Sequence, residues 1–298
     1  MKLGLGTVQF GMEYGNFNVN GQPDLSEIQK ILSQAEEAGV AILDTAPAYK
    51  DSEENIGLSL PADHSFRIVT KTPVFETKKI TNEDILLLKK TFTSSLKKLK
   101  QSSIYALLVH RPADLFCENG ERILKVLTEF KRNKLVDKIG VSVYNSHEIE
   151  KVFAMGFDID LIQLPLNVLD QRLLTSGTLK DLKKKKIEIH ARSIFLQGLL
   201  LKSPEELDPF FNPVRPILKK YHQYIESIKL TPLQSAMSFV QHVAEVDHLI
   251  IGIENLTQFN QLLTAEMSPF QGMDAFKHFS VDDERYLNPS KWTLKGGK

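Results

Sequence analysis

Residues 40–49 read VAILDTAPAY, an apolar run that ends in an acid and is followed five residues later by a tyrosine. Two more apolar, β-branched runs end in a side chain that can carry a proton: FRIVT precedes Lys71, and IYALLV precedes His110. In a barrel of parallel strands, the carboxyl ends of all strands meet at one rim. We therefore expect four side chains to converge there: Asp44, Tyr49, Lys71 and His110.

Eight runs of this kind predict strands, and several are apolar throughout, as expected of parallel strands buried on both faces. They cover Lys2–Thr7, Val40–Thr45, Phe66–Lys71, Ile104–His110, Lys138–Val143, Leu161–Leu166, Glu188–Ser193 and His248–Ile253. Segments with helical periodicity lie between them, at residues 25–38, 82–100, 119–132, 146–155, 175–185, 214–228 and 232–245. Asp24 is the expected N-cap of the first helix and Gly39 its C-terminal stop.

Strand and helix alternate eight times without a dividing linker. This pattern predicts a single α/β domain over residues 1–298, a (β/α)8 TIM barrel of parallel strands. A long loop, residues 194–231, follows the seventh strand and should leave from the rim that carries the four side chains. Long loops inside compact domains are commonly functional.

Composition excludes several classes of protein. Lys+Arg and Asp+Glu are both 37, so the formal net charge is zero, which is not typical of proteins that bind nucleic acids or anionic membranes. The single cysteine, Cys117, excludes an intrachain disulfide and a multi-thiolate zinc site, and the histidines other than His110 show no ligand spacing, so we expect no metal. With no signal-like start and no apolar run of membrane-spanning length, we expect a cytoplasmic monomer or small homo-oligomer.

The four converging side chains suit proton transfer to an oxygen. A tyrosine has a pKa of about 10 in solution, and a nearby ammonium, here Lys71, should stabilise the phenolate and lower that pKa. Asp44 would keep Lys71 charged and in place, while His110 would orient the substrate oxygen. Protonation of a carbonyl oxygen pairs naturally with hydride delivery to its carbon, and proteins need a nicotinamide cofactor for the hydride.

Landmarks along the chain resemble those of the aldo-keto reductase superfamily, in the same order and over nearly the whole length. They are GLGTVQFG, LDTAPAY, IVTKT, LLVHRP, KIGVSVYN, LIQLPLN, ARSIFLQGLLL and LIIGIENLTQFNQ. The resemblance implies a (β/α)8 barrel, an NAD(P)(H) cofactor extended across the rim, and reversible reduction of an aldehyde or ketone. It also implies that Tyr49 is the general acid, that Lys71 and Asp44 tune it, and that His110 positions the carbonyl.

By the same resemblance, the cofactor would contact Gly6, Thr7, Asp44, Ser142, Gln163, Arg192, Ser193, Phe195, Gln197, Gly252, Ile253, Glu254, Asn255 and Gln258. Two positions depart from the family pattern: Val143 replaces a common asparagine, and Arg192 replaces an aromatic ring that stacks on nicotinamide. No lysine or arginine lies between Gly252 and Gln261 to meet a 2′-phosphate, and Glu254 favours a ribose hydroxyl. The cofactor is therefore NADP(H), the family's usual choice, or NAD(H).

The substrate pocket is expected to include Phe10, Tyr14, Tyr49, His110, Arg111 and Tyr144. The substrate would be a small carbonyl compound or alcohol, and a sugar or nucleotide-sugar carbonyl is one candidate. Two other functions stay open at this point. One is a regulatory or scaffold barrel that binds the cofactor with little turnover, and the other is a phosphosugar-type barrel with a carboxylate base.

Overall fold

Eight parallel strands close into a barrel in the computed structural model, which describes residues 3–265 and 272–294. The strands are β1 (Leu3–Gly6), β2 (Ile42–Asp44), β3 (Arg67–Lys71), β4 (Ile104–Val109), β5 (Val136–Ser142), β6 (Leu161–Pro165), β7 (Glu188–Arg192) and β8 (His248–Gly252). Each strand pairs with its sequence neighbours, and β8 pairs with β1, with Leu3 opposite Leu249. The predicted barrel is confirmed, although Lys2 of the first predicted strand lies outside the described residues.

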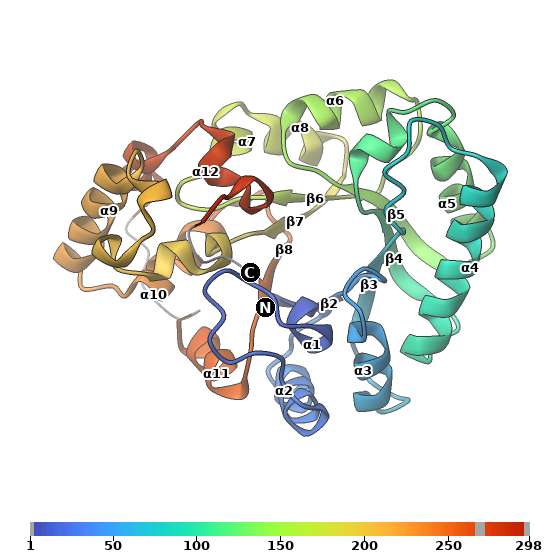
Figure 1. Ribbon diagram of the computed structural model, residues 1–298, viewed down its shortest axis with the longest axis horizontal. Helices are drawn as coiled ribbons and strands as arrows, with labels where there is room; N and C mark the ends of the chain where they lie inside the picture. Colours follow the sequence, from blue (N-terminus) through green and yellow to red (C-terminus); the bar gives the residue numbers. More distant parts are fainter. Residues whose placement is uncertain (1–2, 266–271, 295–298) are drawn as a thin grey trace.

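Helices surround the barrel on its outer side (Figure 1). The α-helices are α1 (Val8–Gly11), α2 (Leu25–Glu37), α3 (Ser52–Ser59), α4 (Asn82–Leu99), α5 (Glu121–Arg132), α6 (Ser146–Ala154), α7 (Arg172–Thr175), α8 (Thr178–Lys184), α9 (Arg215–Ser227), α10 (Pro232–Gln241), α11 (Leu256–Ala265) and α12 (Glu284–Leu287). The predicted cap of α2 is present, because Asp24 accepts a hydrogen bond from the Glu27 amide at 2.8 Å. Gly39 follows the helix with φ +76°, which ends it as predicted.

Two predicted helices differ from those observed. The segment 175–185 contains the end of α7 and all of α8, separated by Gly177, whose φ of +80° breaks the helix. Helix α10 ends at Gln241 instead of residue 245, since Val243 and Val246 are buried and turn the chain towards β8. In the described part of the chain, no helix has the length and apolar character needed to cross a membrane.

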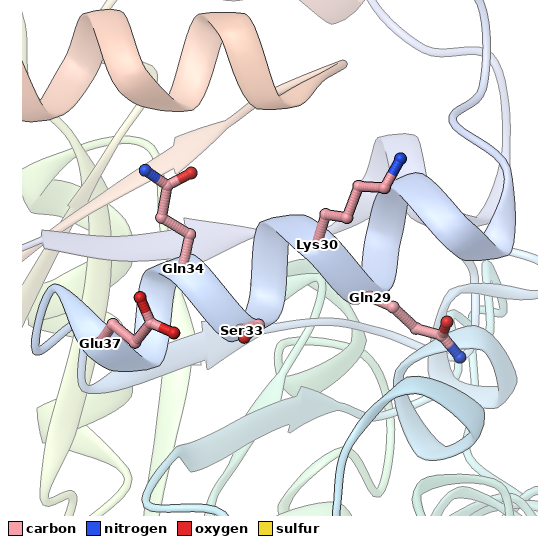
Figure 2. A pocket seen from close by; sticks show the side chains of 5 residues that line it. All are labelled: Gln29, Lys30, Ser33, Gln34 and Glu37. Atoms are coloured by element: carbon pink, nitrogen blue, oxygen red, sulfur yellow. The ribbon is translucent and has the colours of Figure 1, made fainter.

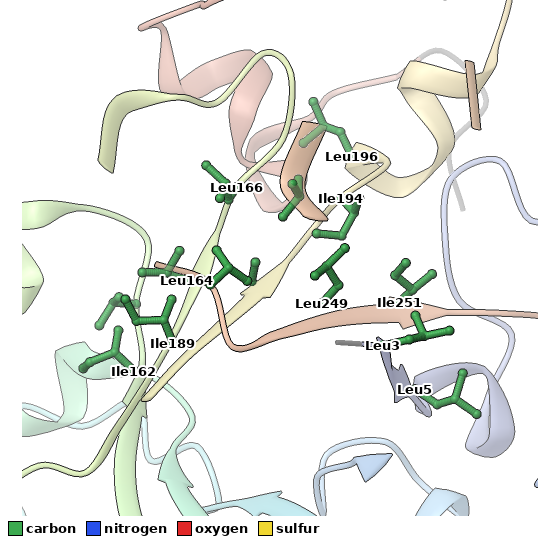
Figure 3. Packing of buried hydrophobic residues seen from close by; sticks show 14 of the residues in the cluster. Leu3, Leu5, Ile162, Leu164, Leu166, Ile189, Ile194, Leu196, Leu249 and Ile251 are labelled. Carbon is green, nitrogen blue, oxygen red and sulfur yellow. The ribbon is translucent and has the colours of Figure 1, made fainter. Parts of the chain in front are cut away.

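Apolar side chains pack on both faces of the barrel wall. Outward-facing residues of β6, β7, β8 and β1 form a cluster against the helices, part of which is shown in Figure 3. A separate buried cluster fills the middle of the barrel with Ile42, Val69, Leu108, Leu161 and Ile250. This cluster, called the apolar plug below, divides the barrel interior into two parts. The upper end lies at the carboxyl ends of the strands, and the lower end lies at their amino ends.

Side chains two residues away along a strand point to the same face. Stepping from the plug towards the upper end therefore places Asp44, Lys71 and Gln163 inside the barrel. Stepping the other way places Arg67 and His248 inside its lower end. Polar groups thus occupy both ends of an otherwise apolar interior.

Candidate active site

A cavity of about 1030 Å³ opens at the upper end of the barrel. Its walls include Asp44, Tyr49, Lys71 and His110, the four side chains that the sequence places at one rim. Small-molecule pockets commonly measure about 300–1,000 Å³, so this cavity has room for a large ligand or for two ligands together. The predicted convergence is confirmed.

A second hollow, of about 490 Å³, lies on the outer surface of α2 (Figure 2). Five polar side chains of this one helix line it: Gln29, Lys30, Ser33, Gln34 and Glu37. None of the four rim residues contributes to it, so we place the chemistry of this protein in the larger cavity.

The carboxylate of Asp44 organises the floor of the larger cavity. Lys71 Nζ donates to Asp44 Oδ2 at 2.7 Å and to the Thr45 carbonyl oxygen at 3.0 Å. Gln163 Nε2 donates to Asp44 Oδ1 at 2.7 Å, and Ser142 Oγ lies 3.3 Å from Gln163 Oε1. Because the Lys71 and Asp44 side chains are only 1% and 7% exposed, this chain of contacts holds the ammonium in one place.

Tyr49 and His110 lie next to this ion pair. Lys71 Nζ is 5.2 Å from the centroid of the Tyr49 ring, and the rings of Tyr49 and His110 meet edge to face at 5.9 Å. The His110 backbone amide donates to Thr72 Oγ1 at 3.2 Å, which fixes the start of the loop after β4. His110 Nδ1 is buried and has no hydrogen-bond partner among the described residues.

Burial sets the protonation states of this group. It raises the pKa of Tyr49 above its ordinary value; Lys71 acts in the opposite direction, as predicted, but does not outweigh burial. Burial also opposes the ammonium of Lys71, yet Asp44 and Tyr49 more than compensate, and the pKa of Lys71 is raised. Burial and the charge of Lys71 lower the pKa of His110 to about 3, so the imidazole is neutral at pH 7.

The predicted loop after β7 does reach the upper end. It contains three short 3-10 helices, η2 (Leu196–Leu201), η3 (Pro204–Glu206) and η4 (Pro209–Phe211), and then α9. Ser193, Leu196 and Gln197 have φ of 60°, 49° and 51°, left-handed values that cost a non-glycine residue on the order of 1–3 kcal/mol. Such strain is concentrated in proteins where a loop shapes a functional site, and Ser193 and Gln197 both line the cavity.

The loop between β1 and α2, residues 12–24, closes the cavity from the other side. Asn16 Nδ2 donates to Gln197 Oε1 at 2.6 Å, and Gln197 Nε2 donates to the Tyr14 hydroxyl at 3.1 Å. Further along, Asn20 Nδ2 donates to Glu254 Oε2 at 2.6 Å. The β1–α2 loop therefore bridges the loops after β7 and β8, an arrangement that the sequence did not predict.

Most residues predicted to contact cofactor or substrate line the cavity: Gly6, Tyr14, Asp44, Tyr49, Lys71, His110, Ser142, Tyr144, Gln163, Arg192, Ser193, Phe195, Gln197, Gly252, Ile253, Glu254 and Gln258. Four do not. Phe10 is fully buried in the core, and Thr7 is fully buried with its hydroxyl on the Asp44 carbonyl oxygen at 3.0 Å. Arg111 turns away to pair with Glu76 at 2.6 Å, and Asn255 caps α11 by accepting from the Gln258 amide at 2.9 Å. The structure therefore places these four side chains outside the cavity wall.

Several polar residues of the cavity wall were not predicted from the sequence, among them Lys202 and Gln9. Lys202 ends the apolar run after β7 and lines the cavity, whereas the family pattern places a cation for the cofactor in the turn after β8. Gln9 also lines the cavity, and its buried Oε1 has no hydrogen-bond partner within residues 3–265 and 272–294. Lys202 could have been predicted, because it is a polar residue at the end of an apolar run that leads from a strand into a loop.

The lower end holds a second polar cluster. Glu188 Oε2 accepts from the Tyr105 hydroxyl at 2.6 Å and from Lys138 Nζ, and Glu188 Oε1 lies 2.7 Å from His190 Nε2. His248 joins this group, with a ligand atom within 4.8 Å of those of Glu188 and His190. This proximity was not predicted, but Lys138 and Tyr105 already engage the carboxylate of Glu188, so we assign the cluster no ligand.

Solved structures share this fold. The aldo-keto reductase AKR11C1 from Bacillus halodurans, in its holo form, superposes with a TM-score of 0.73 at 16% identity, covering 99% of this chain and 94% of that one. PA4992 from Pseudomonas aeruginosa, assigned to the aldo-keto reductases, superposes with a TM-score of 0.65 at 22% identity and 89% coverage of both chains. At these identities, the likeness shows the fold alone.

Sequence comparison goes further. Methylglyoxal reductase DkgA of Escherichia coli K12 is 28% identical over 152 residues, so the chain spans about half the length of this curated relative. The model of the Aldo/keto reductase family matches residues 2–275, which include every strand of the barrel and all four residues of the polar group at its upper end. The chain belongs to the aldo/keto reductase family.

Proposed function

We propose that this protein is an NAD(P)(H)-dependent oxidoreductase that reduces an aldehyde or ketone reversibly. One observation supports this most directly: Tyr49, Lys71, Asp44 and His110 share one end of the 1030 Å³ cavity, whose far wall reaches the turn after β8. The cavity therefore has a reactive end and enough length beyond it to hold a second, larger molecule. Membership of the aldo/keto reductase family supports the same conclusion.

The walls of the cavity fit a dinucleotide. Gln9 offers a buried oxygen without a partner, and Lys202 a cation with no carboxylate at ion-pair distance among the described residues. Ser142 and Gln163 would hold the nicotinamide end, and Lys202 with Ser193 the phosphates. When bound, the nicotinamide supplies or accepts the hydride, which no side chain can do.

Tyr49 is the proposed proton donor. Its raised pKa keeps the hydroxyl protonated at neutral pH, as a general acid requires, and the adjacent Lys71 ammonium stabilises the negative charge left when the proton departs. Asp44 keeps Lys71 charged and oriented. His110, neutral because of its low pKa, would donate a hydrogen bond to the carbonyl oxygen without competing for the proton.

The name of the E. coli relative, methylglyoxal reductase, supports a small aldehyde or dicarbonyl as substrate. The cavity also admits larger molecules, including sugar carbonyls. We therefore propose a small-molecule carbonyl or alcohol as the substrate class. Methylglyoxal, an aryl aldehyde and an aldose form the first panel to assay.

Fluorescence titration of the purified protein with NADPH and with NADH, followed by turnover of this panel, tests the proposal. We expect saturable binding of at least one cofactor and substrate-dependent loss of absorbance at the nicotinamide band. Binding without turnover of any carbonyl or alcohol would favour a regulatory barrel. Binding of neither cofactor would overturn the proposal.

A further inference from the structure

Arg192 ends β7 and lines the cavity at its reactive end. Lys71, the other cation there, is neutralised by Asp44 at 2.7 Å. Within the described part of the chain, no carboxylate lies at ion-pair distance from Arg192. The other acid of the cavity wall, Glu254, is engaged by Asn20 and Gln258 in the turn after β8. The reactive end therefore carries one positive charge that no residue balances.

The Arg192 guanidinium is held in a fixed orientation. Its plane lies over the Tyr144 ring, with Cζ 4.2 Å from the ring centroid. One terminal nitrogen donates to the Val143 carbonyl oxygen at 3.0 Å, and the other to Ser193 Oγ at 3.3 Å. A guanidinium has five N–H donors, so these two bonds leave three for a ligand. A stacked, pre-oriented guanidinium suits two-point recognition of a carboxylate or phosphate.

Arg192 is also close enough to act on the proposed acid and its neighbour. Its charge opposes the rise in the pKa of Tyr49 that burial causes, and it adds to the lowering of the pKa of His110 by burial and Lys71. An anionic group held by Arg192 would therefore belong to the molecule whose carbonyl faces Tyr49. Lys202, ten residues further along the chain, is a separate cation in the same cavity and is available to the cofactor phosphates.

We propose that Arg192 forms an anion subsite that selects carbonyl substrates carrying a carboxylate or a phosphate. This inference rests on the proposed function, since it concerns the substrate of the same reaction. It assigns Arg192 to the substrate, whereas its position in the family pattern suggests contact with the nicotinamide. Arg192 is then a specificity-determining residue and not a group that moves protons.

Matched substrate pairs test this. Succinic semialdehyde against butanal tests a carboxylate, and glyceraldehyde 3-phosphate against glyceraldehyde tests a phosphate. A charge-assisted, two-point contact predicts that the anionic member of at least one pair has a kcat/KM about ten- to a hundredfold higher. The pair that shows the difference identifies the anion.

Arg192→Met should abolish this advantage: kcat/KM for the anionic substrate should fall about ten- to a hundredfold further than kcat/KM for its neutral partner, and the Kd of the cofactor is measured separately in the same variant. Arg192→Lys should retain part of it, because the charge stays and the fork is lost. Arg67→Met is the matched control at the lower end of the barrel and should change neither substrate. Raising the ionic strength should reduce the anion preference of the wild type.

Three results would overturn the inference. They are equal kcat/KM within both pairs, an anion preference that survives in Arg192→Met, or a loss of cofactor affinity in Arg192→Met that explains the whole effect. If neutral carbonyls turn over and the anion preference is absent, only this inference fails. If no carbonyl compound turns over, the proposed function fails. The anion subsite can then be tested alone by calorimetric titration of the wild type and Arg192→Met with succinic semialdehyde. Equal binding by the two proteins would contradict the subsite.

Discussion

The two ends of the barrel interior carry the same four kinds of side chain. At the upper end these are Tyr49, Lys71, Asp44 and His110, and at the lower end Tyr105, Lys138, Glu188 and His190. In both groups the lysine lies over the tyrosine ring, at 5.2 Å and 5.0 Å from the centroid. In both, the lysine is paired with the carboxylate. The residue types alone therefore do not tell a reactive group from a structural one.

The two carboxylates have different partners. Glu188 accepts from its own tyrosine and lies at hydrogen-bond distance from its own histidine. Burial by itself would raise the pKa of Glu188, but hydrogen bonds from His190, Lys138 and Tyr105 lower it well below its ordinary range. Asp44 instead bonds to Lys71 and Gln163, while Tyr49 and His110 line a cavity. We infer that such a set of four side chains can act on a ligand when its tyrosine and histidine face a cavity and do not bond to the carboxylate of the same set.

The largest expected effect comes from removing each tyrosine hydroxyl. Tyr49→Phe should lower kcat for carbonyl reduction by about 10²–10⁴, the usual contribution of a general acid, with cofactor Kd unchanged. Tyr105→Phe should keep near wild-type kcat, because the Tyr105 hydroxyl bonds to Glu188 and Arg67 at the lower end, away from the cavity. Steady-state kinetics with one aldehyde measures both. Near-normal turnover by Tyr49→Phe would remove the distinction between the two ends.

Replacing each lysine by methionine compares burial at the two ends. Lys71→Met should lower the free energy of unfolding by about 3–5 kcal/mol, because it leaves the Asp44 carboxylate buried without its cation. Lys138→Met should cost about 1 kcal/mol or less, since the Lys138 side chain is 32% exposed and Glu188 keeps its other partners. Urea denaturation at pH 7.5 gives both values. Equal losses would show that the lower cluster is as strongly desolvated as the upper one.

Lowering the pH should reduce the stability of the protein through a buried histidine at each end of the barrel, whereas only the upper end bears on activity. Burial lowers the pKa of His110 to about 3 and that of His248 to about 4, below the value of about 6.5 expected after unfolding. The stability linked to each histidine is complete above pH 6.5 and is lost as pH falls towards the folded pKa. His248→Gln should therefore reduce the stability difference between pH 7.5 and pH 5, by at most about 2 kcal/mol.

Urea midpoints at the two pH values measure this change, and the exposed His147→Gln is its control. An unaltered pH dependence in His248→Gln would contradict the predicted burial effect. The pH dependence of activity tests the upper end alone, because His110 lies there. Because His110 stays neutral, kcat/KM for carbonyl reduction should show no inflection near pH 6–7.

The smallest effect is expected from a substitution that changes only the charge of one side chain, at the far side of the upper cavity. Glu254→Lys should raise the ratio of kcat/KM for NADPH over NADH about two- to fivefold, the scale of an exposed charge contact. Glu54→Lys, the same charge change at an exposed position of α3, is the control. An unchanged ratio would show that Glu254 serves only to hold Asn20 and Gln258.

Sequence patterns predicted the strands and the upper group because both depend on local order. Every strand boundary falls within two residues of its prediction, and a polar residue at the end of a buried parallel strand can only point to the rim. Side-chain direction beyond the strand ends was not predictable. Arg111 comes just after β4 and Arg192 ends β7, yet the first meets Glu76 outside and the second lies over Tyr144 inside.

The lower cluster was missed for a related reason. Glu188 and His190 alternate along β7, so both face the barrel interior, but the residues that join them come from β4, β5 and β8. Such contacts depend on strand register around a closed barrel, which spacing along one chain does not reveal. The bridge from Asn16 and Asn20 to the loops after β7 and β8 is of the same long-range kind.

The contacts of Asn16 and Asn20 bear on how fast a bound dinucleotide leaves. With the amide of Asn16 and the hydroxyl of Tyr14, which also bond to Gln197, they make four exposed hydrogen bonds across this gap. At about 0.5–1.5 kcal/mol each, parting all four costs about 2–6 kcal/mol, so the β1–α2 loop would stand open for at most roughly 3% of the time. We expect the residence time of the dinucleotide, and with it the ceiling on turnover, to depend on these two asparagines.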